Sequence, residues 1–238
     1  MAEEWRTKHI SLFEEKSLEH GNLFKSIIEY NHFKNIVEVG VALATTTHYL
    51  CEAAKITEGF VYGYDIFDIH GQRKQFPKFS SLLACEEYLQ EKGHTNFKLT
   101  KIDTLQPTFG EILKKNTPTI DFAFIDGDHS YIGLKNDFEN IYPLLSPYGV
   151  IIFHDTMRID GCREFTFELR TKFYDGTYDI IDFPWGFGSR RCGITLLVKR
   201  TYPINGLMID EQCGSPSTNE EIYKKEIEWY QNEIKKNG

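Results

Sequence analysis

Short apolar runs recur along the chain and alternate with segments of helical periodicity. The first runs, rich in β-branched and aromatic residues, fall at 36–39, 60–64, 97–102, 120–125 and 150–153. Continuous apolar runs are typical of strands that are buried on both faces, and hence of a parallel sheet. Helical patterns lie between and after them at 45–56, 79–92, 108–116, 131–144 and 160–173. This alternation predicts successive right-handed βαβ units.

The alternation stops after the last of these helical patterns. Two further apolar runs, 178–181 and 194–198, are separated only by a loop. Strands joined without a crossover helix pair antiparallel. We therefore expect 178–181 to run parallel to the earlier strands and 194–198 to run the other way. The prediction is an α/β fold, Rossmann-like and doubly wound, with a mostly parallel seven-stranded sheet whose last strand is antiparallel.

The length of the chain, 238 residues, suits one α/β domain over 1–238 better than two independent domains. We divide it into a helical N-terminal segment at 1–33, a Rossmann-like core at 34–200 and a C-terminal extension at 201–238. In that extension, an apolar stripe at 218–236 predicts a helix.

Composition narrows the class of partner. The formal net charge is -8, which disfavours a generic nucleic-acid binder because phosphate binding favours a basic face, although a local basic patch stays open. The N-terminus lacks the pattern of a signal peptide, and no run approaches the ~20 apolar residues of a membrane span. The five cysteines are scattered without a C-x-x-C pair, as in reduced thiols. We expect a cytoplasmic protein that acts on a small molecule, with no nucleic-acid or membrane partner, and that could form a homo-oligomer.

Acidic residues end most of the predicted parallel strands. Asp65, Asp103, Asp126 and Asp155 follow the second to fifth strands, and Glu38 lies within the first. The carboxyl ends of parallel strands share one edge, which is where open α/β sheets bind ligands. A single acid in such a place is usually a turn or capping residue. A succession of them predicts a ligand site.

The turn after the first strand restricts the class of ligand further. Residues 37–47 read V-E-V-G-V-A-L-A-T-T-T. Gly40 permits a tight turn and a close approach of the backbone to a ligand. The threonines that follow could cap the next helix. The turn is not G-x-G-x-x-G, so a dinucleotide fits poorly. Asp65, about 20 residues on, could accept hydrogen bonds from a ribose, so an adenosine-type ligand is expected.

Two segments carry a family resemblance. Residues 122–131 read F-A-F-I-D-G-D-H-S-Y and contain the pattern I-D-G-x-H-x-Y, and residues 147–156 end in H-D-T. Together they resemble the class I S-adenosylmethionine-dependent methyltransferases of the group that includes macrocin O-methyltransferase and cephalosporin-biosynthesis relatives, over about 34–200. The first loop is similar to that group's E-x-G-x-x-x-G-x-S-T, with Ala44 in place of the later glycine and Thr46 in place of serine.

The resemblance implies a cofactor, S-adenosylmethionine, and residues that bind it. Glu38 and Gly40 would lie at its methionine end, Asp65 would hold the ribose, and Asp103 with Thr104 would lie against the adenine. The full set expected at the cofactor is Glu38, Gly40, Val41, Ala42, Asp65, Asp103, Thr104 and Asp126.

The resemblance also implies a catalytic centre. In metal-dependent relatives, the positions that match Asp126 and Asp155 bind magnesium, and His129 matches a candidate base. His154 stands where a relative has an acidic ligand. The expected catalytic residues are His129 and Asp126, and the expected ligands of a Mg²⁺ ion are Asp126, Asp155 and His154. Such an ion would lower the pKa of an acceptor hydroxyl while a histidine takes its proton.

A loop rich in aromatic residues and arginines is the candidate acceptor site. It spans 182–191, and we expect it to emerge at the cofactor edge together with 66–78. Trp185 could stack on a ring, and Arg190 or Arg191 could pair with an anionic group. Packing of Trp185 on the rim of the domain is the competing interpretation.

The remaining polar residues have simpler interpretations. Asp128 is expected to cap the helix that begins near Ser130. The histidines outside the motifs, His20 among them, are interpreted as surface or packing residues. Three other functions stay open: a metal-free O- or N-methyltransferase, an NAD-type oxidoreductase, and a non-catalytic protein that retains the cofactor pocket.

Overall fold

The computed structural model describes residues 2–67, 81–186 and 192–200. Its strands are β1 (Asn35–Val39), β2 (Phe60–Asp65), β3 (Phe97–Lys101), β4 (Ile120–Ile125), β5 (Leu145–His154), β6 (Tyr178–Phe183) and β7 (Ile194–Lys199). Its α-helices are α1 (Ala2–Tyr30), α2 (Thr45–Ile56), α3 (Leu82–Glu91), α4 (Phe109–Asn116), α5 (Tyr131–Ile141) and α6 (Asp160–Arg170). Among the described helices, none combines the length and the apolar character needed to cross a membrane.

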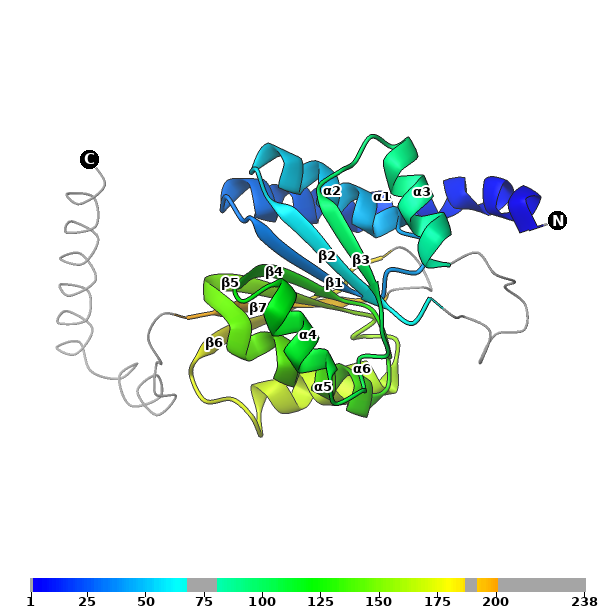
Figure 1. The fold of residues 1–238 in the computed structure, drawn as a ribbon. Helices are drawn as coiled ribbons and strands as arrows, with labels where there is room; N and C mark the ends of the chain where they lie inside the picture. The colour runs from blue at the N-terminus through cyan, green and yellow to red at the C-terminus, as the bar shows by residue number, and fades with distance from the viewer. Residues whose placement is uncertain (1, 68–80, 187–191, 201–238) are drawn as a thin grey trace, which may run out of the picture.

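The strands form one seven-stranded sheet in the order β3-β2-β1-β4-β5-β7-β6. Pairing is parallel from β3 through β5, and β7 pairs antiparallel with both β5 and β6. β6 therefore runs in the direction of the first five strands, and only β7 is reversed, as predicted. β7, the last strand among the described residues, lies inside the sheet, between β5 and β6 (Figure 1).

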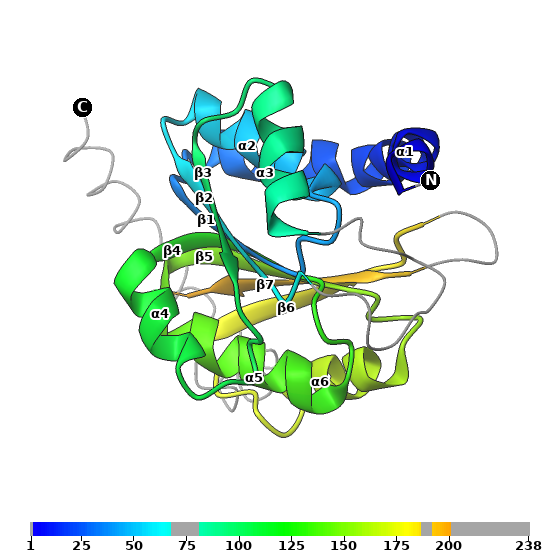
Figure 2. The same ribbon diagram turned by 45° about the vertical axis from the view of Figure 1, so that its right-hand side comes forward.

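Helices cover both faces of the sheet, α1 to α3 on one and α4 to α6 on the other (Figures 1 and 2). Successive strand residues point to opposite faces. In β1, Ile36 joins a core cluster with Phe24 of α1 and Leu50 of α2, whereas its neighbour Val37 joins the cluster beneath α4 to α6 that contains Leu134. Burial on both faces explains the continuous apolar runs of the sequence.

Within the described residues, the predicted helices and strands are present, with two informative shifts of boundary. The helical pattern at 131–144 splits, because α5 ends at Ile141 and a single 3₁₀ turn, η2 (Tyr142–Leu144), follows. Pro143 lacks the N–H that a continued helix requires. β5 begins at Leu145, earlier than predicted, and its register against β4 shifts between Ile120 and Phe122. The helix predicted at 218–236 lies outside the described residues.

Candidate active site

The carboxyl ends of β1, β2 and β4 lie side by side. Val39, the last residue of β1, pairs with Tyr64 on one side and Ile125 on the other. The residues that follow, among them Asp65 and Asp126, therefore meet at one edge, as the sequence predicts. Chain order reverses between β1 and β4, which makes this edge the topological switch point of the sheet.

The turn after β1 requires a glycine at Gly40. Its φ is +91°, and a Cβ there would lie 2.2 Å from the carbonyl oxygen of Asp126. Hydrogen bonds fix the turn on both sides: the N–H of Gly40 donates to the Tyr64 carbonyl at 2.9 Å, and the N–H of Asp126 donates to the Val39 carbonyl at 2.8 Å. The backbone of this turn is thus held close against the turn after β4.

Ala44 adopts the conformation that glycine would favour. Its φ of 63° and ψ of 17° are left-handed, and its methyl group is fully buried. Ala42, in the same loop, also has a positive φ, of 49°. A left-handed conformation costs a non-glycine residue about 1–2 kcal/mol, and the surrounding contacts must offset that cost. Position 44 therefore keeps a left-handed backbone even though this chain has alanine where the similar motif has glycine.

The threonines after the turn do not cap α2, contrary to expectation. Ala44 is the N-cap residue, and no side chain bonds there. Thr47 instead donates its hydroxyl to Glu38 at 2.5 Å, while Thr46 lies 3.2 Å from the hydroxyl of Ser17 and 3.1 Å from Nε2 of His20. The threonines therefore connect the turn to β1 and to α1.

Glu38 is completely buried beneath this loop. Burial raises the pKa of its carboxyl well above the usual value, and the nearby Asp126 and Asp65 raise it further, against the hydrogen bond from Thr47. Oε1 has no hydrogen-bond partner among the described residues. An acidic side chain with one unpaired oxygen thus lies directly below the glycine turn.

The other expected cofactor residues lie along the same edge. Asp65 is half-buried and accepts hydrogen bonds from the N–H of Ala42 at 2.9 Å and of Phe67 at 2.6 Å. Each carboxylate oxygen can accept two hydrogen bonds, so acceptor capacity remains. Asp103 is exposed and accepts from the N–H of Leu105, whereas Thr104 is buried. Val41 is buried against α3, and Ala42 is exposed.

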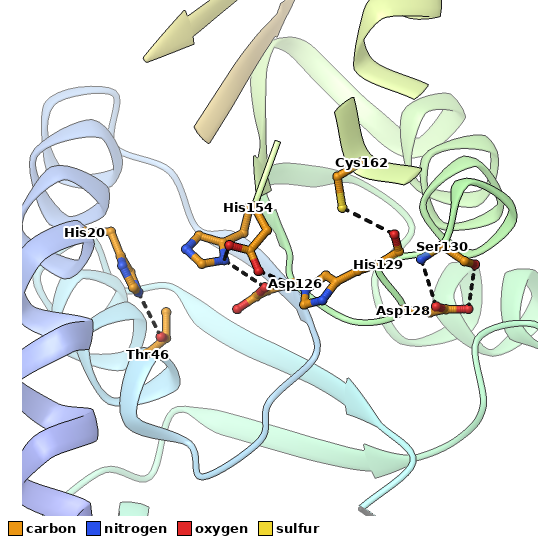
Figure 3. A network of polar contacts seen from close by, with 9 residues as sticks. His20, Thr46, Asp126, Asp128, His129, Ser130, His154 and Cys162 are labelled. Atoms are coloured by element: carbon orange, nitrogen blue, oxygen red, sulfur yellow. Dashed lines mark hydrogen bonds and ion pairs between the residues drawn. The ribbon is translucent and has the colours of Figure 1, made fainter. Parts of the chain in front are cut away.

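Two carboxylates and two imidazoles converge where β4 and β5 end (Figure 3). Asp126 Oδ1 accepts hydrogen bonds from Nε2 of His129 and Nδ1 of His154, both at 2.9 Å. Oδ2 of Asp155 lies 3.9 Å from Nε2 of His129, and its Oδ1 lies 3.8 Å from Nδ1 of His154. We call these four residues the acid–histidine cluster.

Local structure fixes His129 in this cluster. The following residue, Ser130, is the N-cap of α5 and accepts the N–H of Gly133 at 3.0 Å. Asp128, expected to be the cap, instead accepts the N–H of Ser130 at 2.9 Å and so supports the cap from outside the helix. On the other side, a Cβ on Gly161 of α6 would lie 2.6 Å from the His129 carbonyl. α6 therefore packs tightly against the turn that carries His129.

Asp155 is held in an unusual backbone conformation. Its φ is +56°, left-handed for a non-glycine residue. The N–H groups of Arg158 and Ile159 donate to its carbonyl. The residue is 8% exposed, and its Oδ1 has no hydrogen-bond partner among the described residues. A strained, buried acid with an unpaired oxygen is typical of a functional position.

The charges of the cluster support one another. Burial opposes ionisation of Asp126, but the adjacent His154 and His129 outweigh it and hold the pKa of the carboxyl well below its usual value. The hydrogen bond to Asp126 raises the pKa of His129 above its usual value despite burial. For His154, burial acts downward, yet Asp126 and Asp155 raise its pKa. The centre can therefore hold positive charge between two carboxylates.

The structure adds two residues that the sequence interpretation missed. His20 of α1 lies with its ring centroid 5.6 Å from that of His154 (Figure 3). Burial, reinforced by His154, lowers the pKa of His20 to about 4. Cys192, just before β7, has its sulfur within 4.8 Å of ligand atoms of His154 and Asp155. Neither residue belongs to a local motif, because each is brought in by packing between distant segments.

The acceptor loop begins later than predicted, because Asp182 and Phe183 belong to β6, and it is described only in part. Trp185 is partly buried and packs against the core cluster beneath α1 and α2, and its Nε1 has no hydrogen-bond partner among the described residues. Its carbonyl accepts the N–H of Gly193 at 3.0 Å. Arg190, Arg191 and most of 66–78 lie outside the described residues.

Comparison with known proteins agrees with this architecture. A family model described as "Methyltransferase domain" matches residues 37–156, just over half of the chain. An uncharacterized protein of Sinorhizobium fredii, y4gI, is 27% identical over 140 residues, which cover 58% of this chain and 15% of that protein. The chain thus spans a small part of its curated relative.

Solved structures share the fold at low identity. The O-methyltransferase TomG of Streptomyces achromogenes, in complex with S-adenosylmethionine, superposes with a TM-score of 0.58 at 14% identity, covering 76% of this chain and 79% of that one. An O-methyltransferase of Bacillus cereus, in complex with S-adenosylhomocysteine, gives 0.56 at 17% identity, covering 76% and 80%.

Proposed function

Because the chain belongs to the methyltransferase-domain family, we propose that it transfers a methyl group from S-adenosylmethionine to a hydroxyl of a small molecule, assisted by a divalent cation. The observation that carries this proposal is the convergence of the acid–histidine cluster beside the glycine turn, at the switch point of the sheet. The cluster supplies a base and anionic ligands next to the place where a cofactor would bind.

The cofactor would occupy the edge from Glu38 to Thr104. Gly40 allows the backbone to approach the methionine end, and Asp65 retains acceptor capacity for a ribose. Asp103 and Thr104 follow β3, one strand further out than β2, and would border the adenine. Val41, Ala42 and Asp126 complete the proposed pocket.

Methyl transfer is an in-line displacement, so the protein must hold the acceptor oxygen against the sulfonium carbon. His129 would take the proton of the acceptor hydroxyl at Nδ1, because its Nε2–H donates to Asp126, which orients the ring. The donor set fits a divalent cation, since Asp155 presents a buried oxygen without a hydrogen-bond partner among the described residues. Asp126, Asp155 and His154 would hold that ion, and a bound cation lowers the pKa of the acceptor hydroxyl.

The acceptor would lie between this cluster and the loop after β6. β6 runs parallel to β1–β5, so its following loop leaves at the cofactor edge. We propose that Trp185 and one of Arg190 or Arg191 line the acceptor pocket. A hydroxylated sugar or natural-product intermediate would suit an aromatic platform with an adjacent cation.

Calorimetric titration with S-adenosylhomocysteine tests the cofactor. Wild-type protein should bind it and not NAD. Asp65→Ala should weaken binding by about 1–3 kcal/mol, or roughly five- to 150-fold, because a ribose partner is lost. Asp179→Ala is the matched control, since Asp179 lies near the start of β6, away from that edge. Equal affinity in wild type and Asp65→Ala would remove Asp65 from the site, and absence of binding in wild type would overturn the proposal.

Methyl transfer itself can be followed as S-adenosylhomocysteine release with a panel of hydroxylated acceptors. Activity should fall after exhaustive chelation and return with added divalent cation. Unchanged activity after chelation would favour a metal-free mechanism, in which Asp126 only orients His129. Cofactor binding without transfer to any acceptor would favour a non-catalytic binding protein.

A further inference from the structure

We propose that His154, Asp155 and Cys192 form a site for a zinc-class transition-metal ion rather than for magnesium, so that His129 keeps its role as the base. The inference rests on the proposed function in one respect, because it assumes that the divalent cation of that function binds to these residues. The chemistry of the donor atoms determines which ion they select.

The spacing of the donor atoms suits one ion. Zinc–ligand bonds of about 2.0–2.1 Å place neighbouring nitrogen or oxygen donors roughly 3.0–3.4 Å apart. Oδ1 of Asp155 lies 3.8 Å from Nδ1 of His154. A shift of several tenths of an ångström would bring this pair to coordination distance.

Cys192 is brought to the same place by the return of the chain before β7. Its carbonyl accepts the N–H of Met157 at 3.0 Å, and the carbonyl of Gly193 accepts the N–H of Thr156 at 3.3 Å. These bonds fix the segment against the turn that follows Asp155. The sulfur of Cys192 and the ligand atoms of His154 and Asp155 consequently lie within 4.8 Å of one another.

Asp155 provides an independent indication of an ion. It is more than nine-tenths buried, and its Oδ1 faces the cluster without a hydrogen-bond partner among the described residues. A buried carboxylate oxygen without a partner is costly unless a cation or a donor compensates for its lost hydration. A metal ion bound by Asp155, His154 and Cys192 removes that cost.

The donor set disfavours magnesium. Mg²⁺ demands oxygen ligands in near-ideal octahedral geometry and keeps several waters. Here one imidazole, of His154, and one thiol, of Cys192, lie within 4.8 Å of the Asp155 carboxylate. Zinc accepts nitrogen, sulfur and oxygen together and tolerates four-coordinate geometry. It is also an effective Lewis acid toward an acceptor oxygen.

Cobalt(II) is a spectroscopic probe for such a site. We would deplete the 238-residue protein of metal and titrate it with Co²⁺ while recording absorption. Intense visible d–d bands and a near-ultraviolet thiolate-to-cobalt band are expected, Zn²⁺ should abolish both, and a large excess of Mg²⁺ should leave them unchanged. Cys192→Ser should remove the thiolate band and weaken Co²⁺ binding by at least about tenfold. Cys51→Ala, which removes a buried thiol of α2 on the opposite side of the sheet from α4 to α6, should keep the band.

Absence of Co²⁺ binding would overturn the proposal, and so would displacement by Mg²⁺ as readily as by Zn²⁺, or a thiolate band that survives in Cys192→Ser. Asp155→Asn should also lose Co²⁺ binding. If that variant does not fold, Cys192→Ser still tests the proposal, because Cys192 is only half-buried. Titration with S-adenosylhomocysteine on the same preparation separates the two hypotheses. Cofactor binding without Co²⁺ binding refutes only the metal site, and Co²⁺ binding without cofactor binding refutes only the proposed methyl transfer.

Discussion

Gly40 offers the sharpest test of the site's architecture. A methyl group there would lie 2.2 Å from the Asp126 carbonyl oxygen and 2.7 Å from the Gly127 nitrogen, both backbone atoms that no side-chain rotation can move. Gly93, in the turn after α3, has a similar φ of +80°, but a methyl group on it would meet nothing within 4 Å. Replacing each glycine by alanine thus separates the cost of the dihedral angle from that of the steric clash.

Both variants should lose about 1–2 kcal/mol of unfolding free energy to the left-handed conformation. Both regain roughly 0.4–1 kcal/mol because alanine restricts the unfolded chain. Only Gly40→Ala should lose a further ~1–3 kcal/mol, since the turns after β1 and β4 must move apart. Affinity for S-adenosylhomocysteine should fall in Gly40→Ala and stay constant in Gly93→Ala.

Urea unfolding monitored by circular dichroism measures the difference, with m-values compared to confirm that the transitions are equivalent. Calorimetry on the same samples reports cofactor affinity. Equal losses of stability in the two variants would refute the reasoning, because the contact with the Asp126 carbonyl would then carry no cost. Retained cofactor affinity in Gly40→Ala would separate this turn from the cofactor site.

Three further predictions concern other residues of the domain. His129→Ala should lower kcat by about 10²–10⁴ with unchanged affinity for S-adenosylhomocysteine, and a kcat within a factor of two of wild type would exclude it as the base. Burial raises the pKa of Asp137 to about 7 in the folded protein, whereas the pKa in the unfolded chain is about 3.9. The contribution of this carboxyl to the free energy of unfolding is therefore complete below pH 4 and is lost as the pH rises toward 7. Asp137→Asn should therefore flatten the pH profile of the unfolding free energy over that range, and an unchanged slope would contradict a neutral buried carboxyl. Trp185→Ala should raise the KM for the acceptor with little change in cofactor affinity. Lowered thermal stability with a normal KM would instead show that Trp185 only packs the loop against the domain.

Much of the fold follows from local pattern. The buried parallel strands are continuous apolar runs because both faces of the sheet are covered, and the reversed direction of β7 follows from the helix-free connection before it. The position of β7 between β5 and β6 could not be predicted from the sequence pattern. Pairing partners are chosen by contacts between segments distant in sequence, and either order would present the same alternation.

The site residues likewise fall into those that local pattern predicts and those that packing between distant segments brings in. Asp65, Asp126, His154 and Asp155 could be predicted to share an edge, because strand direction alone places them there. His20 could not, since it reaches the cluster only through packing of α1 on the sheet, where Phe24 sits 4.8 Å from Phe124 between ring centroids. The conformation of Ala44 also follows from its surroundings, because alanine by itself disfavours the left-handed region. The narrower resemblance to the macrocin group stays a prediction.

The interior position of β7 also affects the order in which the protein can be completed during synthesis. Until residues 194–199 leave the ribosome, β5 presents an unpaired edge along Val150–Phe153, four core residues made more than 40 positions earlier. β6 emerges first, yet it belongs one position further out and cannot take that edge without displacing the strand still to come. An open apolar edge on a nascent chain is a template for pairing with other chains. Translation speed across the β6–β7 region, and chaperones that shield strand edges, should therefore influence the yield of folded protein.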